Sequence, residues 1–306
     1  MKRLIAIILV CVLLGGCSAE ARKTVYHMNT VMDLKITGRD ADIALARAET
    51  ILTDLESLWS VTAPDSPLSR INRGTDVQLD PANRALLDKA EALSRRTGGA
   101  FNPKLRCLSE VWGFYNESYR VPTDEEIAAA LKEAQWDLGA ALKGHAGAKI
   151  AADLQQLNVH SAILNLGGNV QTYGTKADGT PWQIGIQDPD GGNYLGVVSV
   201  SGTMAVVTSG DYQRFFEADG VRYHHILDPE TGYPADSGLR SVTVICADGM
   251  TADALSTALF VMGLEEGSAL WRESNDFEAV FITADGSIFA TEGANLSGCT
   301  YEVISR

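Results

Sequence analysis

The stretch Met250–Leu259, MTADALSTAL, carries a carboxylate and a hydroxyl four residues apart, at Asp253 and Thr257. On a helix this spacing leaves the two side chains about 40° apart around the axis and one turn along it, so both oxygens can reach one point. Oxygen ligands of this kind suit a hard cation such as Mg²⁺. A purely structural interpretation is also open, because Asp commonly caps helices and Thr commonly bonds its own backbone.

The N-terminus has the pattern of an export signal. Lys2 and Arg3 precede the apolar run Leu4–Leu14, which is too short to span a membrane and is followed by small residues. Leu-Gly-Gly-Cys, ending at Cys17, resembles the lipobox of bacterial lipoproteins, in which the cysteine receives a diacylglyceride. The alternative is a plain secretory signal with an incidental cysteine. We expect a protein that is exported and lipid-anchored to a bacterial membrane, facing the periplasm or the cell exterior.

This interpretation divides the chain into three parts: a signal peptide over residues 1–16, a lipidated tether over 17–24 and a folded domain over 25–306. Loss of the signal removes two positive charges and takes the formal net charge from −14 to −16. So acidic a chain argues against binding to nucleic acid and against electrostatic attachment to anionic lipid. Membrane attachment would therefore depend on the lipid at Cys17.

Three cysteines lie beyond the lipobox, at Cys107, Cys246 and Cys299. Their odd number and unpaired spacing indicate neither a disulfide framework nor a zinc site. Cys246 ends the strand-like run SVTVIC, where a buried thiol is expected.

Periodicity predicts an α+β fold: a single compact domain with mixed or antiparallel sheets and packed helices. Helices are expected over 40–59, 80–97, from 124 onward, over 144–157 and from 250 onward. Strands are expected over 30–36, as short segments within 161–227, over 241–246 and within 277–303. This order is neither a regular βαβ alternation nor a pure sandwich.

Six segments then occur in a fixed order: VWGF after GAFNPKLRCLSE, WDLGAALKGHAGAKIAADL, LNLGGNVQTYG, TSGDYQRFF, HHILDPETGYP and VTVICADGMTADALSTALFVMG. Together they resemble the ApbE family, the FAD:protein FMN transferases. The resemblance runs from about Met28 to the C-terminus, and it implies a T-fold-like domain.

The resemblance also implies a reaction. In the family, FAD is split at its pyrophosphate, FMN is attached by a phosphoester bond to a Thr or Ser of a target protein, and AMP is released. The targets are flavin-carrying subunits of ion-pumping or extracytoplasmic electron-transfer complexes, or proteins with FMN-binding domains. Such phosphoryl transfer calls for a metal that neutralises the pyrophosphate, a base near the acceptor hydroxyl and a rigid flavin pocket.

The metal site of the family corresponds here to Asp253, Thr257 and the backbone carbonyl of Leu142. Ser256 occupies a position where some relatives carry a carboxylate. A hydroxyl there lowers the negative charge of the site and bears on whether one or two metals bind.

Flavin contacts of the family correspond to a set spread over the chain: Met28, Thr62, Ala100, Phe101, Asn102, Gly139, His145 and Leu227. Asn102 replaces the commoner Asp, so any hydrogen bond that it makes would be neutral rather than charge-assisted. Lys143 could face a phosphate, or could be a solvated surface charge.

The pair His224-His225 precedes the Ile-Leu-Asp-Pro core of another family segment. If the segment is a strand, neighbouring side chains point to opposite faces, so only one of the two histidines can face the site. We expect His225 to position the acceptor or to balance charge on the pyrophosphate, and His224 to lie at the surface. Asp228 is expected to shape a turn with the following proline.

Two other functions stay open at this point. The same active site could serve an Mg²⁺-dependent FAD pyrophosphatase, in which water replaces the acceptor hydroxyl and the products are AMP and FMN. A lipoprotein that binds FAD without turning it over would need no metal ligands, so the presence of Asp253, Thr257 and Lys143 argues against it.

Overall fold

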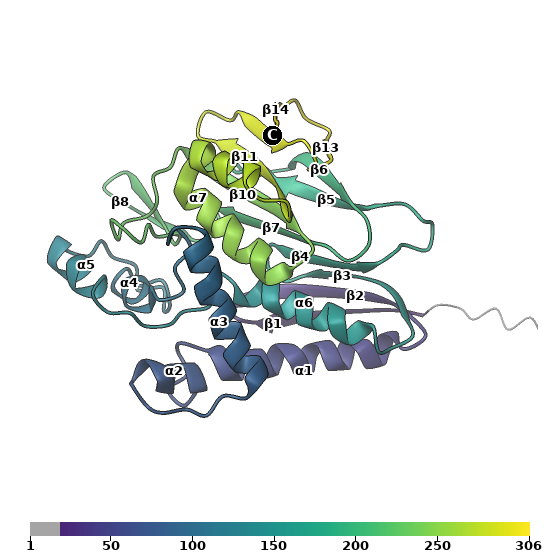
Figure 1. Cartoon of the computed structure of the whole chain (residues 1–306), viewed down its shortest axis with the longest axis horizontal. Helices are drawn as coiled ribbons and strands as arrows, with labels where there is room; N and C mark the ends of the chain where they lie inside the picture. Colours follow the sequence, from purple (N-terminus) through teal and green to yellow (C-terminus); the bar gives the residue numbers. More distant parts are fainter. Residues whose placement is uncertain (1–18) are drawn as a thin grey trace, which may run out of the picture.

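The structure is a computed structural model that describes residues 19–306. Within this range the chain folds as an α+β domain around one large sheet (Figure 1). Its nine strands follow the order β1-β2-β3-β4-β7-β10-β11-β12-β14. They are β1 (Glu20–His27), β2 (Thr30–Gly38), β3 (Val159–Asn165), β4 (Asn169–Gly174), β7 (Ala205–Gly210), β10 (Leu239–Cys246), β11 (Phe277–Thr283), β12 (Ile288–Thr291) and β14 (Glu302–Ile304). All neighbours pair antiparallel except β12 and β14, which are parallel.

Strand β1 corrects the expected boundary of the tether. Residues 20–24, which we expected in the tether, pair with β2 along the whole of β1, from Glu20 opposite Thr37 to His27 opposite Thr30. Ala21 and Val25 are buried against the core, which gives the segment a reason to be ordered. The expected signal peptide and Cys17 lie outside the described residues.

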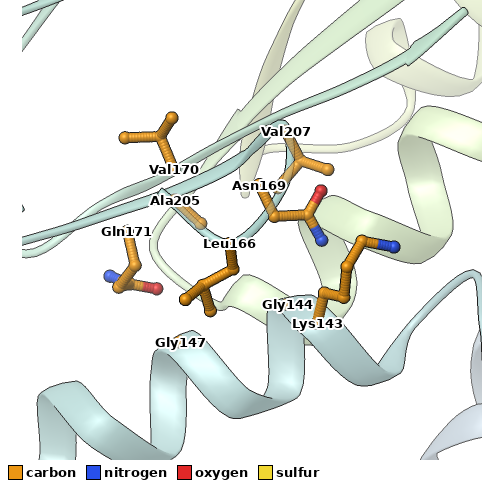
Figure 2. Close-up of a pocket in the computed structure, with 9 residues that line it drawn as sticks. All are labelled: Lys143, Gly144, Gly147, Leu166, Asn169, Val170, Gln171, Ala205 and Val207. Carbon is orange, nitrogen blue, oxygen red and sulfur yellow. The ribbon is translucent and has the colours of Figure 1, made fainter. Parts of the chain in front are cut away.

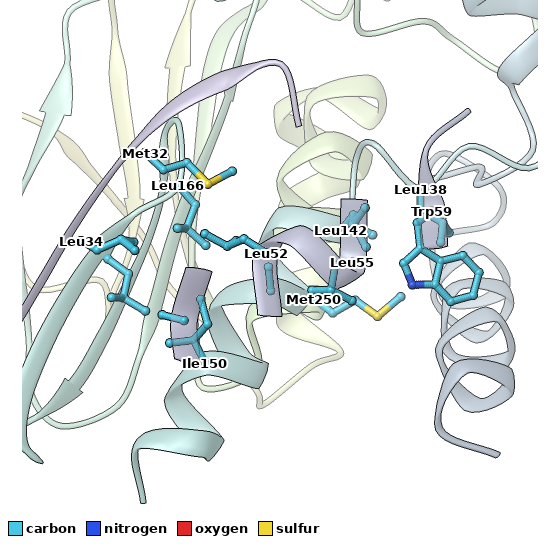
Figure 3. Packing of buried hydrophobic residues seen from close by; sticks show 14 of the residues in the cluster. Met32, Leu34, Leu52, Leu55, Trp59, Leu138, Leu142, Ile150, Leu166 and Met250 are labelled. Carbon is cyan, nitrogen blue, oxygen red and sulfur yellow. The ribbon is translucent and has the colours of Figure 1, made fainter. Parts of the chain in front are cut away.

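One face of the large sheet is covered by helices (Figure 1). α1 (Ala41–Trp59) packs on β1 and β2, α6 (Leu142–Leu154) on β4 and β7, and α7 (Gly249–Arg272) on β7, β10 and β11. α3 (Pro81–Arg96) contacts α7, and the short α2 (Pro67–Asn72) contacts α1. Side chains from α1, α6, α7 and β2 share one core cluster, which includes Met32, Leu52, Leu55 and Met250 (Figure 3).

A small second sheet covers part of the other face. It has the strand order β13-β6-β5, with β5 (Trp182–Gln187), β6 (Tyr194–Val200) and β13 (Leu296–Ser297). Its apolar side chains, among them Ile184 and Val198, pack against Val206, Ile245 and Val280 of the large sheet. The domain therefore has three layers over this half of the sheet.

An aromatic lobe stands at one end of the domain. It contains α4 (Arg106–Val111), α5 (Asp124–Ala130) and the hairpin of β8 (Phe215–Ala218) with β9 (Val221–His224). Trp112 lies within 6.3 Å of the rings of Phe216, Tyr223 and Tyr233, and its indole N–H donates to the carbonyl of Gly232. These contacts anchor the His224-His225 segment to the lobe.

Helices α6 and α7 approach closely at two glycines. A Cβ built at Gly144 would lie 2.0 Å from the carbonyl oxygen of Gly249, and one built at Gly249 would lie 2.3 Å from that of Gly144. Only glycine permits this approach, since any larger side chain would meet backbone that cannot move aside. The contact brings the N-terminal turn of α6 against the N-terminal turns of α7.

The predicted α+β class is confirmed, and so are the long helices and most strands to within a few residues. β1, α2 and α4 were not predicted, because each is short or lacks a long apolar period. Cys246 is buried, as expected, and the cysteines within residues 19–306 are free thiols. In the same range, every helix falls short of the length or the apolar character that crossing a membrane would require.

We predict that Gly144→Ala destabilises the protein despite the higher helix propensity of alanine. Overpacking against backbone costs about 1–3 kcal/mol or more, against a propensity gain of about 1 kcal/mol. Urea unfolding should show a lower midpoint. Gly267→Ala in the same α7 is the matched control, because the nearest atoms to its Cβ would belong to side chains rather than backbone, the closest being a ring atom of Phe281 at 3.1 Å. Equal midpoints for the two variants would contradict the packing argument.

Candidate active site

Asp253 lies at the contact between α6 and α7. Its side chain is buried, with the residue only 4 % exposed, and its Oδ2 accepts a hydrogen bond of 2.9 Å from the backbone N–H of Gly144. The bond fixes the carboxylate against the first turn of α6. Residues 142–144 thus lie beside a buried acidic group.

The charge of Asp253 has no cationic partner. Among the described residues, no Lys, Arg or His forms an ion pair with it. A buried carboxylate without a counter-charge is costly, and such groups are normally paired or bound to metal. The site therefore fits a cation bound through oxygen. It contains no cluster of three or more His, Cys, Asp or Glu within residues 19–306, so a hydroxyl and a backbone carbonyl would have to complete the ligand set.

Thr257 lies one helical turn after Asp253, as the spacing predicts, and its Oγ1 is 3.3 Å from Oγ of Ser209 on β7. Ser256 is used differently. It is 0 % exposed, its hydroxyl donates to the Asp253 carbonyl at 2.8 Å, and it lies 2.8 Å from the same Ser209 hydroxyl. A cation could reach Ser256 only by displacing these bonds. Thr257, with its single contact to Ser209, is therefore more available to a cation than Ser256, whose hydroxyl has two internal partners.

The first turn of α6 carries the other charged group of the site. Leu142 begins the helix, and its side chain belongs to the main core, so its backbone is held in place. The ammonium of Lys143 donates to the Gly139 carbonyl at 3.3 Å, and the Gly139 N–H donates to Oδ1 of Asp137 at 2.8 Å. Lys143 thus folds back over the loop that precedes α6.

His225 follows directly after β9 and faces the loop before that hairpin. Its Nδ1 lies 3.1 Å from the carbonyl oxygen of Arg214, and its ring meets that of Phe114 edge-on at 6.5 Å. Burial lowers the pKa of His225 to about 3, and the positive charges of Arg214 and Lys143 act in the same direction. The ring is neutral at pH 7. Because a carbonyl can only accept, Nδ1 carries the proton and Nε2 keeps a free lone pair.

His224 is not at the surface, which corrects our expectation. It is 7 % exposed, its Nε2 lies 3.1 Å from the Ala235 carbonyl oxygen, and its ring packs edge-on against Phe260 of α7. Strand β9 ends at His224, so the two histidines contact different elements. The ring of His224 is buried under the loop that contains Ala235. Asp228 shapes the following turn as predicted, accepting from the Glu230 N–H and the Thr231 hydroxyl.

The residues predicted for the flavin lie on several elements. Met28 sits in the β1–β2 turn with φ 50°, and its N–H donates to Glu56 of α1 at 3.0 Å. Thr62 is exposed, and its hydroxyl lies 3.2 Å from that of Ser60 in the loop after α1. No hydrogen bond within residues 19–306 joins either side chain to Asp253 or Thr257.

The remaining predicted flavin residues lie in the main core, in the loop before α4, on α6 and in the aromatic lobe. Phe101 is buried, with Ala100 packed on the main core, and the Asn102 side chain accepts from the Lys104 N–H at 2.9 Å. His145 follows Gly144 on α6, and burial lowers its pKa to about 4, with further lowering by the Lys149 and Lys89 charges. Leu227 belongs to the aromatic lobe.

The structure thus joins Asp253 to the α6 turn by a direct hydrogen bond and places Thr257 one turn farther along α7, in contact with Ser209. Sequence reasoning missed Ser209, although the TSGD segment that carries it was recognised. It also missed Asn169 and Gln171, which line a cavity beside Lys143 and Gly144. Their strand-start position after LNLGG was the available signal.

Fold and site together define a single-domain α+β enzyme whose chemistry would use oxygen ligands, a lysine and a neutral histidine. The chain belongs to the ApbE family, which matches residues 28–281.

Relatives agree with this assignment over nearly the whole chain. The "FAD:protein FMN transferase" of Treponema pallidum is 33 % identical over 94 % of this chain and 92 % of its own. The ApbE protein of Thermotoga maritima superposes with a TM-score of 0.81 at 32 % identity, covering 90 % of this chain and 97 % of its own. The flavinyl transferase ApbE of Pseudomonas stutzeri, in its apo form, gives 0.79 at 31 % identity, covering 90 % and 95 %.

We predict that His225 makes stability fall in mild acid. An unfolded imidazole titrates near 6.5, whereas burial lowers the native pKa to about 3. Between these values the unfolded chain binds a proton that the native protein does not, so the free energy of unfolding decreases as pH falls below 6.5, by up to about 1.4 kcal/mol per pH unit. Urea unfolding at pH 7, 6 and 5 should show a smaller pH dependence in His225→Gln; identical slopes would refute the assignment.

Proposed function

We propose that this protein is an Mg²⁺-dependent FAD:protein FMN transferase. The acceptor hydroxyl oxygen of a Thr or Ser attacks the phosphorus of the FMN half of FAD. The bond from that phosphorus to the bridging oxygen breaks, and AMP leaves with that oxygen. The observation that supports this most directly is the buried, unpaired carboxylate of Asp253 beside Thr257, in a chain of the ApbE family.

Asp253, Thr257 and the backbone carbonyl of Leu142 are the groups that would hold Mg²⁺. When bound, the ion supplies charge neutralisation at the pyrophosphate. The chain's own contribution is a rigid seat: the Gly144 N–H orients the carboxylate, and Ser209 lies beside the Thr257 hydroxyl. Both supporting groups belong to elements fixed by the core.

His225 is the residue that we assign to the proton of the acceptor hydroxyl. Its neutral ring carries the proton on Nδ1, held by the Arg214 carbonyl, and leaves Nε2 able to accept. Approach of an anionic pyrophosphate raises the low pKa of the ring, since a nearby negative charge favours the protonated form. Lys143 supplies positive charge on the same side of α6.

The flavin half would be held between the β1–β2 turn and the loops before α6 and after β9. We assign this role to Met28, Thr62, Ala100, Phe101, Asn102, Gly139, His145 and Leu227. The Asn102 oxygen already accepts one hydrogen bond within its own loop, and its NH₂ group is available to the flavin.

The proposal extends to location and partners. A chain lipidated at Cys17 and exported would meet acceptor proteins at a membrane surface, such as flavin-carrying subunits of ion-pumping or extracytoplasmic electron-transfer complexes. The acidic composition gives the protein no electrostatic attraction to anionic lipid, so attachment would rest on the lipid alone.

We predict that the chain from residue 18, incubated with FAD, Mg²⁺ and a domain bearing an acceptor Thr, releases AMP and adds one FMN to that domain. Mass spectrometry of the acceptor, with chromatography of the nucleotides, measures both products. AMP and free FMN with an unmodified acceptor would instead identify a pyrophosphatase. Bound FAD without any AMP would identify a binding protein.

Asp253→Asn serves as the matched test of the metal seat in the same assay. The amide keeps an oxygen for the Gly144 N–H and removes the charge, so the fold should persist while Mg²⁺-dependent AMP release falls at least about a hundredfold. Asp248→Asn on the same helix is the control. Asp248 caps α7 and pairs with Lys89, so its loss should lower stability but preserve the response to Mg²⁺.

We predict that Cys17→Ser moves the protein from the membrane fraction to the soluble fraction without loss of catalysis. A hydroxyl cannot form the thioether to a diacylglyceride, and the anchor is then missing. Fractionation of expressing cells followed by the AMP-release assay measures both properties. Continued membrane attachment of the variant would disprove lipidation at Cys17.

A further inference from the structure

Asn169 begins β4, next to the site but outside every role assigned above. Two glycines of positive φ, Gly167 at 70° and Gly168 at 90°, make the turn from β3, and the Asn165 side chain accepts from the Gly168 N–H. This turn places Asn169 opposite Val207 of β7, under the N-terminal half of α6. Its position is therefore fixed by backbone geometry.

The side-chain amide of Asn169 has no partner. The residue is 5 % exposed, and its Nδ2 is buried without a hydrogen bond to any of residues 19–306. Gln171, two residues along on the same face of β4, differs in its donor group: its Nε2 donates to the carbonyls of Thr172 and Met204, whereas its Oε1 is buried without a donor. A buried donor left unpaired is destabilising, and in native proteins such groups call for an explanation.

The unpaired amide lines a narrow cavity between α6, β4 and β7 that is too tight for a water molecule in this structure, so a substrate oxygen would reach the amide only as the walls move apart. Figure 2 shows Asn169 and Lys143 at one end of this cavity and Gln171 at the other. The Gly144 backbone is also part of the wall, and it is the donor to Asp253. The amide is therefore beside the candidate metal seat and beside Lys143.

The strand register leads to the same place. On β7, Ser209 follows Val207 by two positions and so shares its face of the sheet. Ser209 contacts Thr257, and Val207 is the partner of Asn169. Strand β7 therefore contacts both groups: it pairs with Asn169 through Val207, and it contacts Thr257 of α7 through Ser209.

We propose that the Nδ2 group of Asn169 donates a hydrogen bond to a phosphoryl oxygen of the bound substrate. This inference rests on the proposed function and adds a substrate-contacting residue to it. An amide donor suits an anionic oxygen without adding charge, and the adjacent Lys143 supplies the charge. Substrate binding would then give the Asn169 Nδ2 group the acceptor that the protein itself does not provide. The free energy lost by burying this donor unpaired would be recovered only in the complex.

The test compares ligands that are not turned over: FMN and AMP, which each carry one phosphate of FAD, and riboflavin, which carries none. Isothermal titration in Mg²⁺ should show that Asn169→Leu weakens FMN or AMP binding about tenfold to a hundredfold while riboflavin is unaffected. Thermal unfolding without ligand should show the variant at least as stable as wild type, because no protein hydrogen bond is lost.

Asn169→Asp provides a second variant of the same shape. A carboxylate repels a phosphate, so FMN or AMP binding should weaken again. Tighter Mg²⁺ binding by this variant would overturn the proposal, because it would show that the side chain at position 169 offers an oxygen to the cation. Gln171→Leu is the control; it removes two internal hydrogen bonds, so it should lower thermal stability without a phosphate-selective loss.

Equal loss for riboflavin and FMN, or no loss in either Asn169 variant, would overturn the proposal for Asn169 alone. A wild-type protein that binds none of FAD, FMN and AMP would instead overturn the proposed function. The two failures are therefore distinguishable within one set of titrations.

Discussion

The hydrogen bond from the Gly144 N–H to the Asp253 carboxylate joins the two helices that carry the site. It forms because Gly144 and Gly249 bring the helix backbones to a separation that no side chain would allow. Three polar residues of the site are positioned by this contact. Lys143 precedes Gly144, Thr257 follows Asp253 by one turn, and Asn169 lies under the same turn of α6. The large sheet and the α1 core hold both helices and so keep the contact closed.

This arrangement buries charged and polar groups that the protein does not itself pair, which lowers its stability. A carboxylate is buried without a cation, an amide donor is buried without an acceptor, and burial holds His225 and His145 neutral by lowering their pKa values. Each feature costs stability that the surrounding core must offset. Such losses of stability are typical of binding sites whose polar groups are arranged to pair with a ligand rather than with one another.

Sequence reasoning could predict which residues share a local face but not what each side chain contacts. The four-residue spacing of Asp253 and Thr257 fixes a shared helix face, because helical geometry is local. Whether Ser256 points outward or toward β7 depends on Ser209, which is 47 residues away in the chain. His224 was misplaced for the same reason, since its seat is made by Ala235 and Phe260. β1 was missed because its partner strand, rather than its own weak alternation, makes it ordered.

Charge balance connects these features to the proposed substrate. Asp253 contributes a buried carboxylate to the site and Lys143 an ammonium group, while the pKa values of His225 and His145 are lowered far enough to keep both rings neutral at pH 7. A divalent cation together with a doubly charged pyrophosphate would add no net charge to this set. Either one alone would leave two uncompensated charges in a poorly solvated place, which is unfavourable. The architecture therefore favours joint binding of metal and dinucleotide, and it explains how a chain with a net charge of −14 can accept an anionic substrate.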